Sequence, residues 1–135
     1  MTPDEFLLDE TRQWLVKARN DIRAAEISAR HDLEEVAVYH CQQAAEKTLK
    51  AFLTFRQQPF RKTHNLKDLG EACVALDPSL PASVQASFGL TEYVWIFRYP
   101  GGPREIEEGE AENALRLAQR LYEDVSMRLP AGAQP

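Results

Sequence analysis

The side chains best suited to ligand chemistry lie between residues 39 and 50. An aromatic ring, an imidazole, an amide and two ammonium groups come from Tyr39, His40, Gln43, Lys47 and Lys50. At about 100° per residue, a helix places them on one polar arc. The arc also holds Gln42 and Glu46, opposite an apolar stripe of Ala37, Cys41, Ala44, Ala45, Leu49 and Phe52. Such groups can stack on a base, donate to phosphate and read hydrogen-bonding edges, but a solvated or dimer-forming face has the same pattern.

The charge distribution marks the same region. Six Lys and Arg residues and no acid lie within residues 47–67, whereas the other 10 bases of the chain are set against 21 acids. Five glutamates fall within residues 105–112, and the net charge is −5. A basic segment in an acidic protein indicates an anionic ligand or a complementary partner surface, although chance clustering stays open. The net charge argues against a general nucleic-acid coat.

A Pro- and Gly-rich loop supplies further candidates. Arg98 and Tyr99 precede the loop and Arg104 follows it, so backbone amides and guanidinium groups can reach a phosphate there. The loop is not a P-loop, because GxxxxGK[ST] is absent. We expect Lys47, Lys50, Arg98 and Arg104 to converge on phosphate, with Lys47 and Arg98 exposed. The alternative is that Arg98 pairs with an acid while the loop only turns the chain.

Two imidazoles and one carboxylate have structural alternatives to ligand binding. His64 follows Thr63 at a predicted helix start, where its ring can bond to the backbone. His40 borders the apolar stripe and can form a hydrogen bond between helices. Glu46 is spaced for a helical pair with Lys50. The sequence leaves both possibilities open for each of these residues.

Helices must position these groups. Apolar periodicity and the placement of Pro and Gly predict helices over residues 4–29, 33–56, 65–76, 83–97 and 107–129. Asn65 is the expected N-cap of the third, and Gly89 is a weak point in the fourth. We predict an all-α fold, an antiparallel up-and-down bundle of four to five helices, as one domain over residues 1–135. Trp14, Phe88, Trp95 and Phe97 are expected in the core, and residues 130–135 are expected to be disordered.

Other functional classes receive no support from the sequence. No stretch approaches the roughly 20 apolar residues of a membrane span, and the acidic start argues against a secretory signal. Cys41 and Cys73 have no metal-ligand or disulfide spacing. No carboxylate spacing compels a metal site, and GxSxG is absent. We therefore expect a cytoplasmic protein with no membrane association, metal or cofactor.

Several motifs together resemble a known family. They are the run YHCQQAAEKTLKAFL at residues 39–53, THNL at 63–66, RYP at 98–100, and Trp14, Ala18 and Asp21. This pattern closely resembles the HEPN (higher eukaryotes and prokaryotes nucleotide-binding) domain family over about residues 8–128. The resemblance implies a bundle that usually dimerises and binds nucleotide or RNA. It also implies a minimal nucleotidyltransferase as partner, in a toxin–antitoxin-like pair. Four large side chains suit a dimer because they are many for one core: Phe52, Phe55, Phe60 and Phe97.

One departure from the family pattern concerns catalysis. Many HEPN proteins are metal-independent ribonucleases with a histidine four to six residues after an arginine. Here YPGGPREI follows Arg98, without a histidine. We therefore expect a binding module with little or no cleavage. One alternative is a metal-independent endoribonuclease with other catalytic residues, for which His40 and His64 are the candidates. Another is a dimeric interaction module without a nucleotide ligand.

Overall fold

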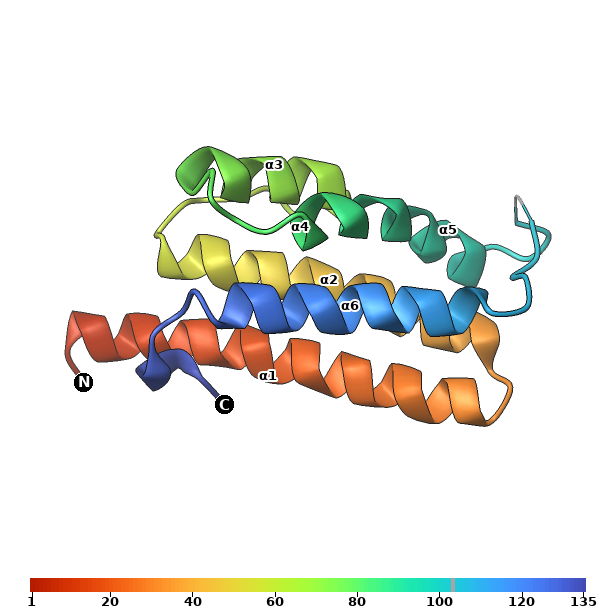
Figure 1. Cartoon of the computed structure of the whole chain (residues 1–135). Helices are drawn as coiled ribbons and strands as arrows, with labels where there is room; N and C mark the ends of the chain where they lie inside the picture. Colours follow the sequence, from red (N-terminus) through yellow and green to blue (C-terminus); the bar gives the residue numbers. More distant parts are fainter. Residues whose placement is uncertain (103) are drawn as a thin grey trace.

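The structure, a computed structural model, describes residues 1–102 and 104–135. The long helices α1 (Pro3–Arg30), α2 (Glu34–Phe55) and α6 (Glu110–Ser126) lie side by side, as Figure 1 shows. Above them lie α3 (Leu66–Leu76) and a segment made of α4 (Ser83–Ala86), the 3-10 helix η1 (Ser87–Glu92) and α5 (Tyr93–Arg98). No strand occurs in these residues. The predicted all-α up-and-down bundle is confirmed: α1, α2, the α4 to α5 segment and α6 alternate in direction.

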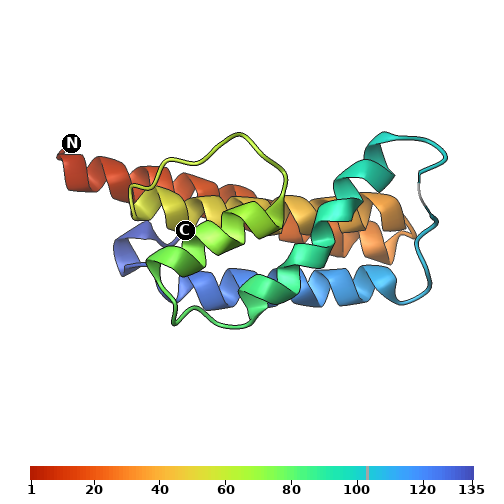
Figure 2. The same ribbon diagram turned by 90° about the horizontal axis from the view of Figure 1, so that it is seen from above.

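The helix ends follow from local chemistry. Thr2 and Glu5 form a reciprocal capping box at the start of α1, with Pro3 in the first turn. The Asn65 side chain accepts from the backbone amides of Lys67 and Asp68, which confirms the predicted cap of α3. Between α2 and α3, the loop arches back along the bundle (Figure 2). This loop carries His64 toward the middle of α2.

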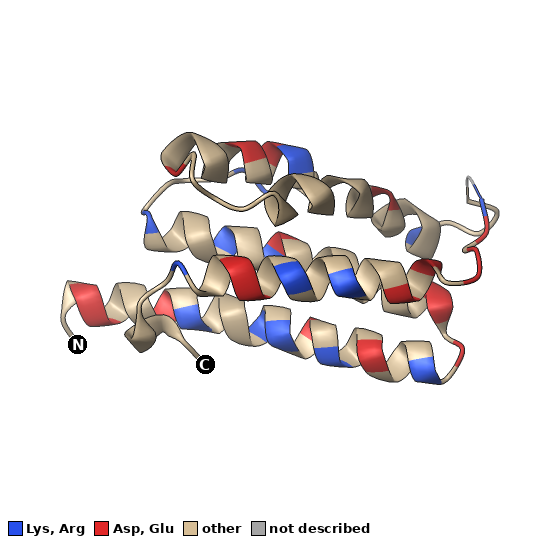
Figure 3. Ribbon diagram, viewed as in Figure 1, with Lys and Arg blue, Asp and Glu red and all other residues tan. Residues whose placement is uncertain are grey.

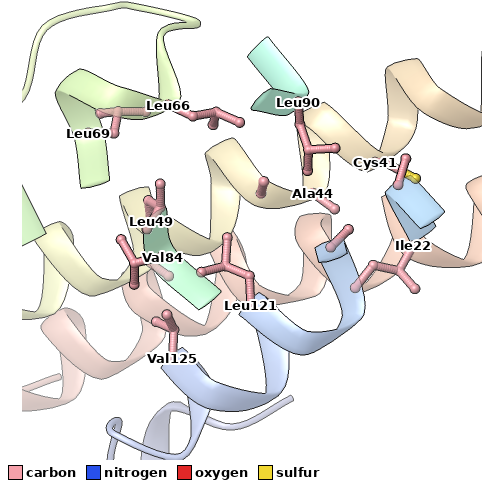
Figure 4. Packing of buried hydrophobic residues seen from close by; sticks show 14 of the residues in the cluster. Ile22, Cys41, Ala44, Leu49, Leu66, Leu69, Val84, Leu90, Leu121 and Val125 are labelled. Atoms are coloured by element: carbon pink, nitrogen blue, oxygen red, sulfur yellow. The ribbon is translucent and has the colours of Figure 1, made fainter. Parts of the chain in front are cut away.

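The core centres on α2. Its residues Ala37, Cys41, Ala44 and Ala45 are at most 1% exposed. Because their side chains are small, neighbouring helices can approach α2 closely. Larger side chains from α2, α3, η1 and α6 close around them, as Figure 4 shows for Leu49, Leu66, Leu90 and Leu121. Burying each large apolar side chain contributes about 1.5–3 kcal/mol. The predicted stripe of α2 is therefore the buried stripe.

The fourth predicted helix differs from expectation in its register. Five of its buried residues recur every three positions, namely Val84, Ser87, Leu90, Tyr93 and Ile96, and Val94 is buried beside them. A 3-10 helix has 3.0 residues per turn, so this spacing keeps one face on the core. Gly89, the predicted weak point, lies within η1. The prediction that Trp95 and Phe97 belong to the core is wrong: after η1, the helix α5 buries Tyr93, Val94 and Ile96, and Trp95 and Phe97 are 50% and 42% exposed.

The C-terminal residues are ordered against α1, so the predicted disorder of residues 130–135 is wrong. Ala131–Ala133 form the 3-10 helix η2, and Ala133 is buried. The Gln134 amide donates to the carbonyls of Ser126 at 2.7 Å and Leu129 at 3.2 Å. Gly132 lies against Leu8, and its carbonyl accepts from Arg12. A composition of Pro, Ala and Gly with a single polar side chain, Gln134, gave no sign of these specific contacts.

No helix in the described part of the chain is both long enough and apolar enough to cross a lipid bilayer.

Candidate functional site

The first polar cluster joins α1 to α2 at Asp21. One carboxylate oxygen of Asp21 lies 2.8 Å from His40 Nδ1, and the other accepts from Lys47 Nζ at 2.6 Å. Asp21 is buried, whereas the side chains of His40 and Lys47 are partly exposed, at 29% and 22%. An ionised carboxylate only accepts hydrogen bonds, so Nδ1 carries the proton and Nε2 is the nitrogen left for a ligand. The predicted interhelical bond of His40 is confirmed.

The second cluster centres on Glu46 and lies deeper. Its carboxylate accepts from Lys50 Nζ at 3.0 Å, His64 Nδ1 at 2.8 Å and Gln42 Nε2 at 3.2 Å. Burial alone would raise the pKa of Glu46, but the hydrogen bonds from His64, Lys50 and Gln42 outweigh it and lower the pKa below its usual range. The predicted pair of Glu46 with Lys50 is confirmed. The His64 ring bonds to this carboxylate rather than to the backbone.

Two glutamines connect this cluster to its surroundings. Gln43 Nε2 donates to Gln42 Oε1 at 2.7 Å, and Gln42 Nε2 donates to the carbonyl of His64 at 3.1 Å. Gln42 is fully buried, and Lys50 lies over the rings of Trp14 and Phe60, 5.6 and 5.7 Å from the centroids. The hydrogen bonds of Gln42 and His64 therefore fix the loop before α3 onto α2.

A third cluster holds the loop after α5. Arg104 donates to both carboxylate oxygens of Glu110, at 2.7 and 2.6 Å, and also to Glu92. Tyr93 donates its hydroxyl to Glu110 at 2.6 Å. The Arg104 guanidinium, with Tyr93 and the Glu107 amide, lowers the pKa of Glu110 to about 2. This arrangement ties α6 to α5, and it occupies Arg104 with carboxylates.

The four predicted phosphate-binding cations differ in their surroundings. Lys50 is buried and Lys47 is half-buried, and both are paired with acids, so the prediction of an exposed Lys47 is wrong. Arg104 is held by two acids. Arg98 is exposed and forms no ion pair with any described residue. Ligand binding by these four residues stays a prediction, and Arg98 is the member whose charge is uncompensated.

Aromatic contacts bring Arg98 near the motif in α2. Tyr39 stacks on Phe97 with ring centroids 4.2 Å apart, and the same ring meets His40 edge-on at 5.5 Å. Next to Phe97 in the chain, Arg98 and Tyr99 end α5. The structure thus groups five residues at one end of the bundle, here called the α2/α5 face: Tyr39, His40, Phe97, Arg98 and Tyr99. Gln43, Lys47, Lys50 and His64 form the polar network that continues along α2, while Arg104 belongs to the separate cluster on α6.

Phe97 and Trp95 are the surface residues that sequence reasoning missed. The signal was present in the three-residue spacing of Val84, Ser87, Leu90 and Tyr93, which indicates a 3-10 register rather than an α-helical one. Across residues 1–102 and 104–135, no group of three or more His, Cys, Asp or Glu side chains is arranged to hold a metal ion.

Comparisons with known proteins identify the family of this helical bundle. The family model for the HEPN domain matches residues 11–128. The chain belongs to the HEPN family. This HEPN protein is also similar to the crystal structure of TT1696 from Thermus thermophilus, with a TM-score of 0.79 and 33% identity. That similarity covers 90% of this chain and 99% of TT1696. Comparison with curated proteins gives no significant match.

The family match confirms the resemblance seen in the sequence and supports a nucleotide- or RNA-binding type of module. The matched residues include both carboxylate–histidine pairs, Asp21 with His40 and Glu46 with His64, and also Arg98. This chain has no histidine four to six residues after Arg98, so it departs from the arginine–histidine pattern of the HEPN ribonucleases described above.

Proposed function

We propose that this HEPN protein binds nucleotide or RNA at the α2/α5 face. The observation that carries the proposal is Arg98, an exposed guanidinium without an acidic partner among the described residues. Phe97, which precedes Arg98 in the chain, forms a stacked aromatic pair with Tyr39. A planar guanidinium binds phosphate through two parallel hydrogen bonds, and aromatic rings take bases. The face therefore offers both chemistries that a nucleotide needs.

In this proposal, the polar residues of α2 that are paired with acids mainly hold the ligand-binding groups in place. Asp21 holds His40 by Nδ1, which presents Nε2 as the nitrogen available to a ligand. Lys47 compensates the charge of Asp21 and stays partly accessible. Gln43, Lys50 and His64 keep α2 and the following loop in register through Gln42 and Glu46. The ligand contacts then come mainly from Arg98, with His40, Tyr39 and Tyr99.

A minimal nucleotidyltransferase is the proposed partner, in a toxin–antitoxin-like pair, and the chain is proposed to form a homodimer. This part of the proposal rests on what the resemblance to the HEPN family implies. A neighbouring reading frame for a small nucleotidyltransferase, and co-purification of the two full chains, would be the expected results. If the two purified chains do not associate, either with or without added nucleotide, the proposed pairing is contradicted.

A second candidate function is metal-independent RNA cleavage. The observation in its favour is that both His40 and His64 are held through Nδ1 by carboxylates, the arrangement that orients an imidazole for proton transfer. Binding is the preferred function, because Arg98 is not followed by the motif histidine. Cleavage assays with His40→Ala and His64→Ala separate the two.

The direct test of binding compares two arginines of equal charge. Arg98→Ala should weaken binding of a short labelled RNA about 10-fold or more, since hydrogen bonds to charged groups contribute about 1.5–3 kcal/mol. Arg116→Ala is the control, because Arg116 is exposed on α6 and is also without an ion pair among the described residues. Arg98→Ala should also reduce, by about one, the slope of the logarithm of the binding constant against the logarithm of the salt concentration. Equal effects of the two substitutions would refute the assignment.

A further inference from the structure

The end of α5 exposes an unusual concentration of aromatic surface. Eight large hydrophobic side chains are exposed among the described residues, and three of them lie within residues 95–99. Trp95, Phe97 and Tyr99 are 50%, 42% and 55% exposed. Figure 3 shows few charges along the α4 to α5 segment, where residues 83–98 include only Glu92 and Arg98 as charged residues. Exposed apolar surface of this kind marks an interaction site.

The exposed rings are already arranged in stacks. Tyr39 and Phe97 lie 4.2 Å apart with an interplanar angle of 24°. Trp95 and Tyr99, one helical turn apart, lie 6.0 Å apart with an angle of 15°. Partly exposed, near-parallel rings offer a further flat surface on which a base can stack. Because partner rings restrain them, less side-chain freedom is lost on binding.

Arg98 lies in sequence between the two stacks. Phe97 precedes it and Tyr99 follows it, so one ring of each stack is the chain neighbour of Arg98. A purely apolar partner would cover the rings but leave Arg98 buried without a counter-ion, which is costly. A single strand of nucleic acid alternates bases with phosphates, and it satisfies both kinds of group at once. In a duplex the bases already stack on each other, so their faces are unavailable.

We propose that the two aromatic stacks bind unpaired bases of single-stranded nucleic acid, with Arg98 on the phosphate between them. This inference rests on the proposed function and specifies its ligand as a strand with at least two accessible bases. The shared chemistry is an unpaired base joined to a phosphodiester, which both RNA and DNA supply. Every base has a flat aromatic face, so the stacks accept different sequences.

Fluorescence of Trp95 tests the stacking directly. The chain has two tryptophans, and the conservative Trp14→Phe substitution leaves Trp95 as the reporter. Titration with a short single-stranded RNA, and with DNA of the same sequence, should quench Trp95 to saturation with one or both strands. The strand that quenches identifies the source of the ligand. The same strand annealed to its complement should quench much less.

Substitution of the exposed rings measures how much each stack contributes to binding. Phe97→Leu and Trp95→Leu should each weaken binding of the labelled single strand about 5- to 100-fold, the range found for loss of one stacked base. Phe6→Leu is the matched control, because Phe6 is also exposed but lies on the first turns of α1. Circular dichroism verifies that each variant is folded, and the two ring variants serve as independent tests.

The outcomes separate this inference from the proposed function. If no nucleotide or strand binds the unmodified chain, the proposed function fails and the inference fails with it. If binding depends on Arg98 but Trp95 is not quenched and Phe97→Leu matches Phe6→Leu, the function stands and the stacking inference is overturned. If Phe97→Leu instead converts a dimer to a monomer, and RNA leaves Trp95 fluorescence unchanged, the surface is an interface between copies and the inference is also overturned.

Discussion

Replacement of Glu46 by glutamine tests the buried polar network of α2. Glu46 and Lys50 are only 4% and 8% exposed, and Glu46 accepts hydrogen bonds from three side chains. Glu46→Gln keeps the size of the side chain but leaves the Lys50 ammonium buried without its counter-ion. Loss of one partner from a buried ion pair costs about 3–5 kcal/mol. We therefore expect the free energy of unfolding to fall by about 3 kcal/mol.

The matched control is Glu71→Gln. Glu71 also pairs with a lysine four positions away, Lys67, but the two side chains are 61% and 69% exposed and 3.7 Å apart. An exposed pair contributes about 0.2–1 kcal/mol or less. Urea unfolding followed by helix circular dichroism measures both variants. A loss for Glu46→Gln that equals the loss for Glu71→Gln would refute the account of the network.

A double variant identifies the source of the cost. If the unpaired ammonium is responsible, Lys50→Met added to Glu46→Gln should recover about 1 kcal/mol or more, because a neutral side chain of similar volume needs no counter-ion. No recovery would show that the lost bonds of His64 and Gln42 carry the effect instead.

The pH dependence of the same variant follows from the lowered pKa of Glu46. In the unfolded chain the carboxyl titrates at its ordinary value of 4.5, and in the folded chain it titrates lower. The stabilisation is therefore fully present above pH 4.5 and is lost as the pH falls through the folded pKa. The difference in unfolding free energy between the original chain and Glu46→Gln should shrink below pH 4.5, whereas a constant difference would contradict the assignment.

Three further predictions concern assembly, chemistry and packing. Sedimentation should show a dimer at micromolar protein, and a monomer at all concentrations would contradict the proposal. With chelator present, the full chain should bind RNA with little or no cleavage; robust cleavage that His64→Ala abolishes would favour the enzyme instead. Gly70→Ala should destabilise by about 1–3 kcal/mol, because its Cβ would lie 2.3 Å from Phe88 Cε1. Gly89→Ala, in open space, is the control and should have a much smaller effect.

The long helices were predictable from sequence because they depend on residues that are close together in the chain. No Gly and no Pro other than Pro3, in the first turn, lies within residues 3–30 and 34–55, and the apolar stripe of α2 indicates which face is buried. The pair of Glu46 with Lys50 follows from helical spacing alone. The Asn65 cap follows from residue type at a helix start.

What escaped prediction depends on how distant segments meet. Asp21 lies 19 and 26 residues from His40 and Lys47, and only the packing of α1 on α2 brings the three together. Sequence spacing therefore assigned Lys47 to solvent. The exposure of Phe97 likewise depends on the 3-10 register of η1, which an assumed 3.6-residue period conceals.

Mapping of ligand contacts by NMR tests the central claim most directly. In the isotope-labelled full chain, addition of a short single-stranded RNA should shift the amide signals of Tyr39, His40, Phe97, Arg98 and Tyr99. The basic segment is the informative alternative, because Arg56, Arg61, Lys62 and Lys67 are also exposed. Shifts concentrated at the α2/α5 face, and lost in Arg98→Ala, are the predicted result. Shifts confined to residues 56–67, or the absence of any shift at saturating RNA, would contradict the account.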